Sequence, residues 1–338
     1  MRLMDAVAEN RLLTRWADLL PRAPGQRGGV HETDAELVPL GDGRLLALTV
    51  DTVDEEVRCG LYRDPRTVGR VAAVAALSDL AAVGAEPIGL LLSVALPAAG
   101  RERAQERLAL GVREVCEAAG TFVLGGDTND GASLGVTAVA AGLVPSALPL
   151  TRLGARPGEV VGVTGLLGAG AALAATALLG APGLGEDSFR PTPRLREGRA
   201  LRGAVSACMD TSDGLVATLD QLARLNGVAI RVTAAAGSLL EPRADAVRRA
   251  LGLPAFAFLA APHGEYELAF TVPAGRWEAL SAVAARGGWR ALAIGTVEAG
   301  EGVWLGGRAV DGARVRNLLG EHGGDARACA RALAGMAS

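Results

Sequence analysis

The chain has 338 residues, half of them apolar, with a formal net charge of −3 and only 3% aromatic side chains. This length is enough for about two domains, and the mild acidity and scarcity of aromatic residues argue against a nucleic-acid partner. All 34 basic side chains are arginines, which excludes mechanisms that need a lysine, such as a P-loop lysine or a Schiff base.

The N-terminal half of the sequence alternates between strands and helices. Helices are predicted at residues 1–20, 67–85 and 101–120, and strands at 44–54, 88–97 and 133–144. Residues 21–29 read as a flexible loop, and residues 122–131 as a strand followed by a glycine-rich turn. The apolar stretch 88–97 is too short to span a bilayer, and the start of the chain does not resemble a signal peptide. These features predict a cytoplasmic protein without a membrane segment.

A second domain is predicted to begin at residues 151–159, a segment rich in proline, glycine and arginine. This boundary separates an N-terminal domain, 1–150, from a C-terminal domain, 151–338. The elements predicted in the second domain are a strand at 159–165, helices at 171–180 and about 213–226, strands at 228–234, 267–273 and 291–297, a proline-rich connector at 191–198, and a loosely held helix at 320–338. Because strands and helices do not alternate strictly, we predict an α+β or α/β class that contains antiparallel sheet.

One aspartate lies where burial should exclude a charge. Asp79 occurs in the predicted helix at 67–85, whose sequence VAAVAALSDLAAVGA is apolar on most faces, so that the helix should be buried. An ionised carboxylate without a partner in such a place costs several kcal/mol and needs a cation or hydrogen-bond donors. The alternative to a metal site is a structural aspartate that caps a helical turn or pairs with a buried arginine.

Further aspartates lie where other apolar strands end. They are Asp51 and Asp54 in one segment, Asp127 in a second, and Asp210 and Asp213 in a third. Any one of them could be a turn or N-cap residue. Together they are typical of a site in which carboxylates and phosphate oxygens hold Mg²⁺. Gly125 and Gly126 would let a phosphate approach the backbone closely.

The remaining polar residues do not suggest nucleophilic catalysis. Ser212 has no histidine nearby in the sequence, so its hydroxyl is expected to bind phosphate or metal-bound water. Residues 165–170 (GLLGAG) read as a strand-to-helix turn rather than a phosphate loop. The histidines and cysteines are too far apart in the sequence to indicate a catalytic triad or a structural zinc site. They are His31, His263, His322, Cys59, Cys116, Cys208 and Cys329.

Four segments of the sequence resemble the thiamine-monophosphate kinase family, part of the aminoimidazole-ribonucleotide-synthetase-like superfamily. They are LSDLAAVGAEP (77–87), LGGDTNDG (124–131), PTPRLREGRAL (191–201) and MDTSDGL (209–215), in the family's order. The resemblance implies an N-terminal α/β domain that forms a homodimer through its sheet, and a C-terminal α/β domain. It also implies that ATP binds with magnesium in a cleft between the domains, and that the γ-phosphate passes directly to a small-molecule acceptor.

The resemblance also assigns roles to individual residues. The implied metal-binding residues are Asp34, Thr49, Asp51, Asp79, Asp127, Asp210 and Asp213, of which Asp51, Asp79 and Asp213 are assigned to catalysis. The implied nucleotide contacts are Gly125, Gly126, Asp127, Arg152 and Ser212, and the implied acceptor contacts are Arg58 and Glu265. Metal ions and arginine would thus bind the phosphates in a protein that has no lysine.

The sequence departs from the family mainly where the acceptor binds. The family's histidine aligns with Arg58, and its substrate-facing glutamate aligns with Gly264. No counterpart is found of the C-terminal tryptophan expected to cover the thiamine. One acid of a pair is replaced by Thr33, and one hydroxyl by Val50. Because a site that hydrogen-bonds its substrate rejects analogues strongly, these changes predict an altered acceptor, more anionic than thiamine monophosphate, that faces Arg58.

Two other functions stay open on the sequence alone. One is another ATP-dependent synthetase of the same superfamily. The branches that need a reactive cysteine near one end are disfavoured, because the first cysteine is Cys59 and the sequence finishes GMAS. The other is a degenerate homologue that binds nucleotide without kinase activity, which the changes at Thr33 and Gly264 would suit.

Overall fold

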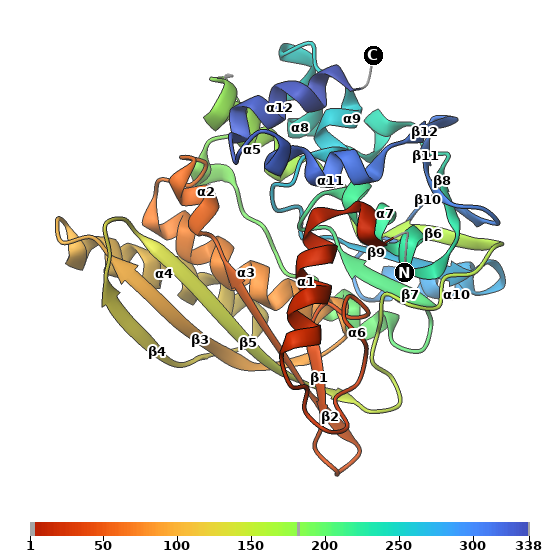
Figure 1. Ribbon diagram of the computed structural model, residues 1–338, viewed down its shortest axis with the longest axis horizontal. Coiled ribbons are helices and arrows are strands. Elements are labelled where there is room, and N and C mark those ends of the chain that lie inside the picture. The colour runs from red at the N-terminus through yellow and green to blue at the C-terminus, as the bar shows by residue number, and fades with distance from the viewer. Residues whose placement is uncertain (1–3, 181–182, 337–338) are drawn as a thin grey trace.

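Two β-sheets, with helices between and around them, make up the part of the chain that the computed structural model describes, residues 4–180 and 183–336 (Figure 1). The predicted helix at 1–20 and the predicted tail at 320–338 extend beyond this part, because residues 1–3 and 337–338 lie outside it. None of the described helices combines the length and the apolar character that a membrane crossing requires.

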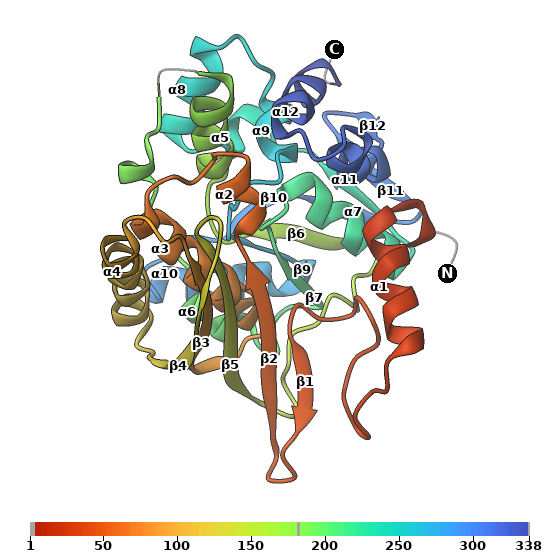
Figure 2. The same ribbon diagram turned by 60° about the vertical axis from the view of Figure 1, so that its left-hand side comes forward.

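Sheet A is built from the N-terminal part of the chain. Its strands are β1 (Glu36–Pro39), β2 (Arg44–Thr52), β3 (Glu86–Leu96), β4 (Val123–Asp130) and β5 (Gly135–Pro145). They lie in the order β1-β2-β5-β3-β4, and only the pair β3 and β4 is parallel (Figure 2). The helices of this part are α1 (Ala8–Leu19), α2 (Asp54–Arg58), α3 (Pro65–Ala82) and α4 (Arg101–Ala119), after a 3-10 turn at Met4–Ala6.

Sheet B is built from the C-terminal part. Its strands are β6 (Glu159–Val163), β7 (Ala207–Asp210), β8 (Ala229–Val232), β9 (Leu268–Pro273), β10 (Leu292–Glu298), β11 (Gly302–Leu305) and β12 (Arg308–Val310). They lie in the order β12-β11-β8-β10-β6-β9-β7, and only β8 and β11 pair in parallel. The helices are α5 (Ala169–Leu179), α6 (Leu195–Leu201), α7 (Leu215–Asn226), α8 (Pro242–Ala250), α9 (Ala255–Ala260), α10 (Trp277–Arg286), α11 (Gly312–Glu321) and α12 (Ala326–Gly335), with 3-10 turns at Glu186–Ser188, Ala236–Leu239 and Ala274–Arg276. The predicted class, α+β or α/β with antiparallel sheet, is confirmed, and the strand pairs are mainly antiparallel.

Helix α3 lies between the two sheets. It begins after Asp64, whose carboxylate accepts a hydrogen bond from the Arg66 amide and so caps the helix. Most of the helix is buried, because it packs against β2 and β5 of sheet A and also against β7 and α6. Helix α4 crosses it closely at Gly111, where a Cβ atom would lie 2.0 Å from the Arg66 carbonyl oxygen. A side chain near the end of α3 can therefore reach both domains.

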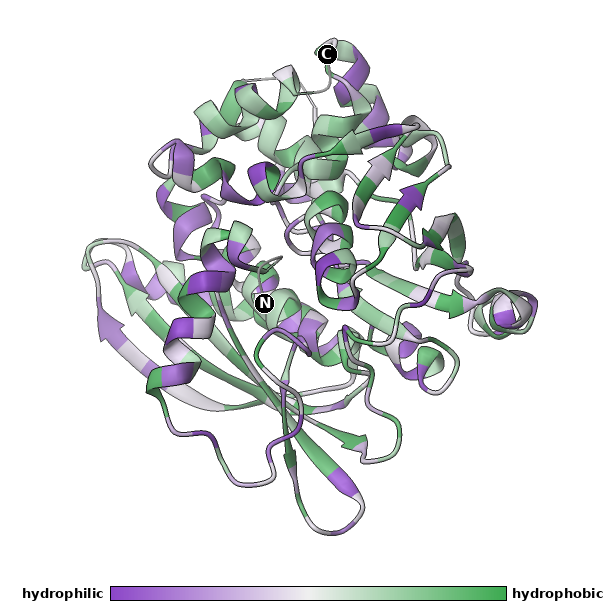
Figure 3. Cartoon of the chain, turned by 45° about the vertical axis from the view of Figure 1, so that its right-hand side comes forward, coloured by the Kyte–Doolittle hydropathy of each residue, from purple (hydrophilic) through white to green (hydrophobic). Residues whose placement is uncertain are grey.

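One face of sheet A is covered by α3 and α4, and the other face is largely open to solvent (Figures 1 and 2). The strand register places Val50, Val139 and Leu91 in one row on this open face. Val50 is 62% exposed and Leu91 is 46% exposed. The strands are largely hydrophobic in Figure 3. An apolar face of this kind is typical of an interface.

Residues 122–131 are predicted as a strand followed by a glycine-rich turn; the strand is confirmed and the turn is wrong. Strand β4 continues through Gly125 and Gly126 to Asp130, paired with β3. A Cβ atom at Gly126 would lie 2.1 Å from the Leu92 carbonyl oxygen. The glycine is therefore needed for the close approach of two strands rather than for a turn.

Two further segments differ from the prediction. Helix α6 begins inside the predicted connector at 191–198. The tail after residue 320 is not loosely held, because α12 buries Cys329 and Leu333 against the rest of the domain. Sequence reasoning did not anticipate β1, α2, α8, α9, α10, β11, β12 or α11, most of which are short and lack a clear period.

Candidate active site

Three aspartates that are remote in the sequence converge between the two sheets. Asp34 lies in the loop before β1, Asp79 lies in the last turn of α3, and Asp210 is the last residue of β7. One carboxylate oxygen of each lies within 4.8 Å of the others. All three belong to the predicted metal-binding set, and this spacing would let them bind one cation together.

Hydroxyl groups orient two of these carboxylates. Thr49, in β2, donates a hydrogen bond to Asp79. Ser78, in α3, donates to Asp210 of the other domain at 2.7 Å, and Ser212 donates to the second oxygen of Asp210 at 3.0 Å. Such bonds fix the carboxylate rotamers before any ligand binds. Sequence reasoning missed Ser78, although a Ser-Asp pair in an apolar helix was the available signal.

A half-buried arginine partly neutralises the cluster. Nη2 of Arg152 lies 2.9 Å from Oδ1 of Asp34, and the Asp34 side chain is only 1% exposed. The Asn226 side chain donates to the Arg152 carbonyl and so holds the backbone in place. The structure thus places Arg152, a predicted nucleotide contact, directly against a predicted metal ligand. Its Nε is buried and bonds to no other described residue.

Burial, followed by the charges of neighbouring carboxylates, raises the pKa values of the clustered carboxyl groups. Burial, together with the charges of Asp213 and Asp34, raises the pKa of Asp51 to about 6, and its side chain lies within hydrogen-bonding reach of Asp79. Burial and the charges of Asp51 and Asp210 raise the pKa of Asp79 well above its usual value. Burial and the charge of Asp34 raise the pKa of Asp210 to about 7. Without a cation, burial and neighbouring negative charge therefore favour the protonated forms of these carboxyl groups.

The donor set fits magnesium. It consists of carboxylate oxygens, which hard divalent cations prefer. Oδ2 of Asp34 and Oδ2 of Asp51 are buried, and neither accepts a hydrogen bond from any residue of 4–180 or 183–336. Buried oxygens of this kind require a donor or a cation. A bound Mg²⁺ would satisfy them and lower the raised pKa values.

These pKa shifts predict how the stability of the metal-free protein depends on pH. A carboxyl group whose pKa is higher in the folded than in the unfolded state makes the folded protein bind more protons. The free energy of unfolding should therefore fall as pH rises from about 4 to about 7, the window set by Asp51 and Asp210. Urea unfolding in EDTA at several pH values would measure this. Added Mg²⁺ should flatten the dependence, and a rise of stability across the window would contradict the proposed cluster.

Asp127 stands apart from this cluster. The register places Asp51 in one row with Gly126, on the face of sheet A that carries α3. Asp127 is in the neighbouring row with Thr52, on the open face. Its exposed side chain accepts a hydrogen bond from Asn129. Within one chain, Asp127 and Asp51 therefore point to opposite sides of the sheet.

Asp213, another residue of the predicted metal-binding set, lies outside the group formed by Asp34, Asp79 and Asp210. Asp213 is exposed in the turn between β7 and α7. Val50, where the family has a hydroxyl, points to the open face of sheet A, away from Asp79. The loss of that hydroxyl therefore leaves Asp34, Asp79 and Asp210 undisturbed.

The two predicted acceptor residues, Arg58 and Glu265, form hydrogen bonds with backbone groups of the protein. Nε of Arg58 donates to the Asp54 carbonyl of its own helix, and the Arg58 side chain is exposed. The Glu265 carboxylate accepts hydrogen bonds from the amides of Gly168 and Ala171 at 2.5 and 3.2 Å. Glu265 thus occupies the N-terminus of α5, where a negative charge is favoured. In the turn at 165–170, the Gly168 amide is therefore already bonded to the carboxylate of Glu265.

Comparison with known proteins identifies the family. Two family models match, one described as the AIR synthase related protein N-terminal domain at residues 32–144, and one as its C-terminal domain at 156–306. The thiamine-monophosphate kinase of Salmonella typhimurium is 33% identical over 249 residues, which cover 71% of this chain and 75% of that protein. The chain belongs to the thiamine-monophosphate kinase family. The enzyme of that name from Halobacterium salinarum is also 33% identical, over 70% of this chain and 79% of its own length.

Solved structures of the thiamine-monophosphate kinase family share the fold over nearly the whole chain. The enzyme from Aquifex aeolicus gives a TM-score of 0.73 at 27% identity and covers 92% of this chain and 99% of its own. The complex described as AaThiL with AMPPCP and TMP gives a TM-score of 0.75 at 27% identity, over 92% of this chain and 97% of that one. HypE of E. coli, a hydrogenase maturation protein, gives 0.67 at 23% identity, which shows the fold alone.

Proposed function

We propose that the protein transfers the γ-phosphate of ATP to thiamine monophosphate, with Mg²⁺, and so forms thiamine diphosphate and ADP in the cytoplasm. One observation carries the proposal: Asp34, Asp79 and Asp210 come from three separate segments and meet with oxygens within 4.8 Å. The relatives' printed names support the reaction, and the AaThiL complex with AMPPCP and TMP supports the pair of substrates.

The chain's own residues prepare the site for phosphates. Thr49 and Ser78 hold Asp79 and Asp210 in fixed rotamers, and Arg152 offsets part of the negative charge. Asp34, Asp79 and Asp210 would hold Mg²⁺, which would supply positive charge against the negative charge that develops during transfer. Most of the catalysis then comes from positioning and electrostatic stabilisation.

The acceptor needs no strong base from the protein. The attacking oxygen of thiamine monophosphate belongs to a phosphate group whose second pKa is about 6, so it is already ionised at neutral pH. This chemistry agrees with a site made of aspartates, hydroxyls and an arginine. The protein has to align the two phosphates rather than remove a proton.

We assign the adenosine of ATP to a cavity of 830 Å³ between α4 and the β3–β4 edge. Its walls are mainly apolar, with Leu108, Val112 and Phe122 among them, as suits a flat heterocycle. Its boundary includes Gly126, a nucleotide contact predicted on β4, and Asp127, whose side chain points to the opposite face of the sheet.

We further propose that the protein is a homodimer joined through the open face of sheet A. The row Val50, Val139 and Leu91 would be buried in such an interface. Asp127 lies on the same face, so dimerisation would also bring it close to a second chain. This would give Asp127 a role that it cannot have at the Asp79 cluster of its own chain.

Leu91→Arg should convert the dimer to a monomer. The substitution places a charge in the centre of the apolar row, where burial without a partner is costly. Light scattering coupled to size exclusion would measure the mass. Leu110→Arg, on the exposed side of α4, is the matched control and should leave the mass unchanged. A wild-type protein that is monomeric at micromolar concentration would refute the dimer.

The reaction is tested by ADP release with Mg-ATP and thiamine monophosphate, with thiamine diphosphate identified chromatographically. Melting curves with and without Mg-ATP are the second measurement, because a ligand at 100 times its Kd should add about 2.7 kcal/mol. A shift without turnover on any acceptor would identify the degenerate homologue that binds nucleotide, and the absence of both turnover and shift would refute the proposed reaction. If there is a shift but only a more anionic acceptor stimulates turnover, the altered acceptor suggested by Arg58 is correct.

A further inference from the structure

A buried hydroxyl without a partner lies at the wall of the cavity that we assign to adenosine. Thr121 is 4% exposed and lines this cavity. Its Oγ1 atom is buried and forms no hydrogen bond with any residue of 4–180 or 183–336. A buried hydroxyl left in this state costs free energy. Because Thr121 borders a cavity, a bound ligand can supply the missing hydrogen bond.

The other polar side chains that line this cavity are exposed. Arg113 and Glu117, on α4, form an ion pair with each other, with 3.7 Å between Nε and Oε1. The buried part of the wall is apolar and includes Leu108 and Val112. Among the polar lining residues of the described chain, only Thr121 is buried. The inner part of the cavity therefore has one side-chain hydroxyl with which it can read a ligand.

The C-terminal end of α4 favours one role for this hydroxyl. The helix ends at Ala119, and Gly120 follows it in the left-handed conformation, with a φ of +67°. The Thr121 amide donates a hydrogen bond to the Cys116 carbonyl at 2.9 Å, so Thr121 directly follows the last turn of the helix. The last carbonyl groups of a helix lack intrahelical partners and carry partial negative charge. A hydrogen-bond donor of the ligand is therefore favoured here over an acceptor.

We propose that Thr121 is a specificity-determining residue, whose hydroxyl accepts a hydrogen bond from the exocyclic amino group of adenine. A purine with an oxygen at that position presents an acceptor instead of a donor, and the end of α4 would disfavour it. The inference rests on the proposed function, which places the adenosine of ATP in this cavity. It adds the residue that distinguishes a 6-amino purine from a 6-oxo purine.

Thr121→Val tests the inference through nucleotide selectivity. Valine keeps the shape of the side chain and removes only the hydroxyl. The wild type should bind Mg-ATP about tenfold or more tightly than magnesium inosine triphosphate, which carries an oxygen in place of the amino group. Thr121→Val should reduce this preference to about twofold or less, whereas the KM for thiamine monophosphate should stay within about twofold of wild type. Calorimetry measures the two Kd values for each protein.

Thr271→Val is the matched control. Thr271 lies in β9 of sheet B, and its hydroxyl is also buried without a partner in the described part of the chain. Thr271 does not line the cavity, so its replacement should leave the selectivity unchanged. Without ligand, both variants should unfold at the wild-type urea midpoint or above it, because each loses an unsatisfied polar group. A lower midpoint for Thr121→Val alone would make its hydroxyl a structural group and overturn the inference.

The remaining outcomes separate this inference from the proposed reaction. An unchanged preference for ATP in Thr121→Val overturns the role of Thr121, as does a wild type that binds the two nucleotides equally well. Turnover of thiamine monophosphate would support the reaction in either case. A wild type that selects ATP through Thr121 but does not phosphorylate thiamine monophosphate would instead refute the kinase reaction while supporting Thr121. A wild type that binds neither nucleotide would overturn both.

Discussion

Replacing Asp79 by asparagine is expected to lower kcat/KM for phosphoryl transfer about a thousandfold. The variant keeps the size of the side chain, and its amide oxygen can still accept the hydrogen bond from Thr49. It loses the charge that Asp79 contributes beside Asp34 and Asp210. The affinity for Mg²⁺ and the neutralisation of the transferring phosphate should both decrease. Initial rates over a range of Mg²⁺ concentrations would separate the two effects.

The same substitution should stabilise the metal-free protein. Burial and neighbouring carboxylates raise the pKa of Asp79, so its ionisation opposes folding at about pH 8. In EDTA, the free energy of unfolding of Asp79→Asn should therefore exceed that of the wild type. Asp42→Asn, in the exposed β1–β2 hairpin, is the matched control and should keep its activity. Full activity in Asp79→Asn would remove Asp79 from the active site.

Arg152→Gln is expected to lower the free energy of unfolding by about 3 kcal/mol in EDTA. Arg152 is the salt-bridge partner of Asp34, whose side chain is 1% exposed. Without it, the Asp34 charge stays buried beside Asp79 and Asp210. Urea unfolding measures the loss. Saturating Mg²⁺ should recover part of it, because a bound cation replaces the missing positive charge.

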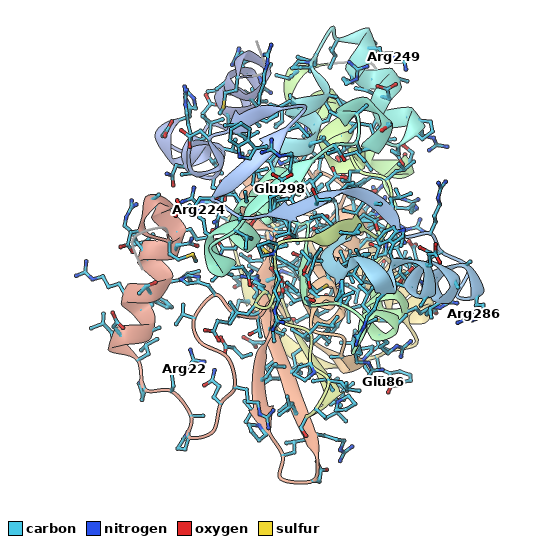
Figure 4. All side chains as sticks on the ribbon, turned by 90° about the vertical axis from the view of Figure 1, so that its right-hand side faces the viewer. Arg22, Glu86, Arg224, Arg249, Arg286 and Glu298 are labelled. Atoms are coloured by element: carbon cyan, nitrogen blue, oxygen red, sulfur yellow. The ribbon has the colours of Figure 1, made fainter. Side chains whose placement is uncertain are left out.

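The control for this variant is Arg286→Gln on α10. Arg286 is exposed, and Figure 4 shows it at the periphery of the molecule. Its replacement should change the free energy of unfolding by less than about 0.5 kcal/mol. If Arg152→Gln lost the same stability with and without Mg²⁺, the effect would come from packing, and the electrostatic account of the cluster would be wrong.

The local structure of the site could be predicted from the sequence. The apolar run around Asp79 predicts a buried helix, and α3 is indeed buried between the sheets. A charge in such a helix requires a partner. The structure places Asp79 beside Asp34 and Asp210, and Arg152 forms a salt bridge with Asp34. The strand that carries Asp51 and the strand that ends at Asp210 were also predicted, because apolar runs bounded by polar turns have a local signature.

The face on which each side chain lies could not be predicted. Asp51 and Asp127 both follow apolar runs, yet the ladder places them on opposite faces of sheet A. A shift of one residue in the register reverses every side chain of a strand. The glycines before Asp127 read as a turn, and only the pairing of β4 with β3 shows that the strand continues.

The sequence by itself determined the type of most long elements, the need of Asp79 for a cation or hydrogen-bond donors, and a chemistry without lysine. These depend on composition and on short-range periodicity. Only the tertiary structure decided that Asp34, Asp79 and Asp210 meet and that Arg152 pairs with Asp34. Such proximities depend on how two domains pack around α3, because residues far apart in a chain have no local signal of their final distance.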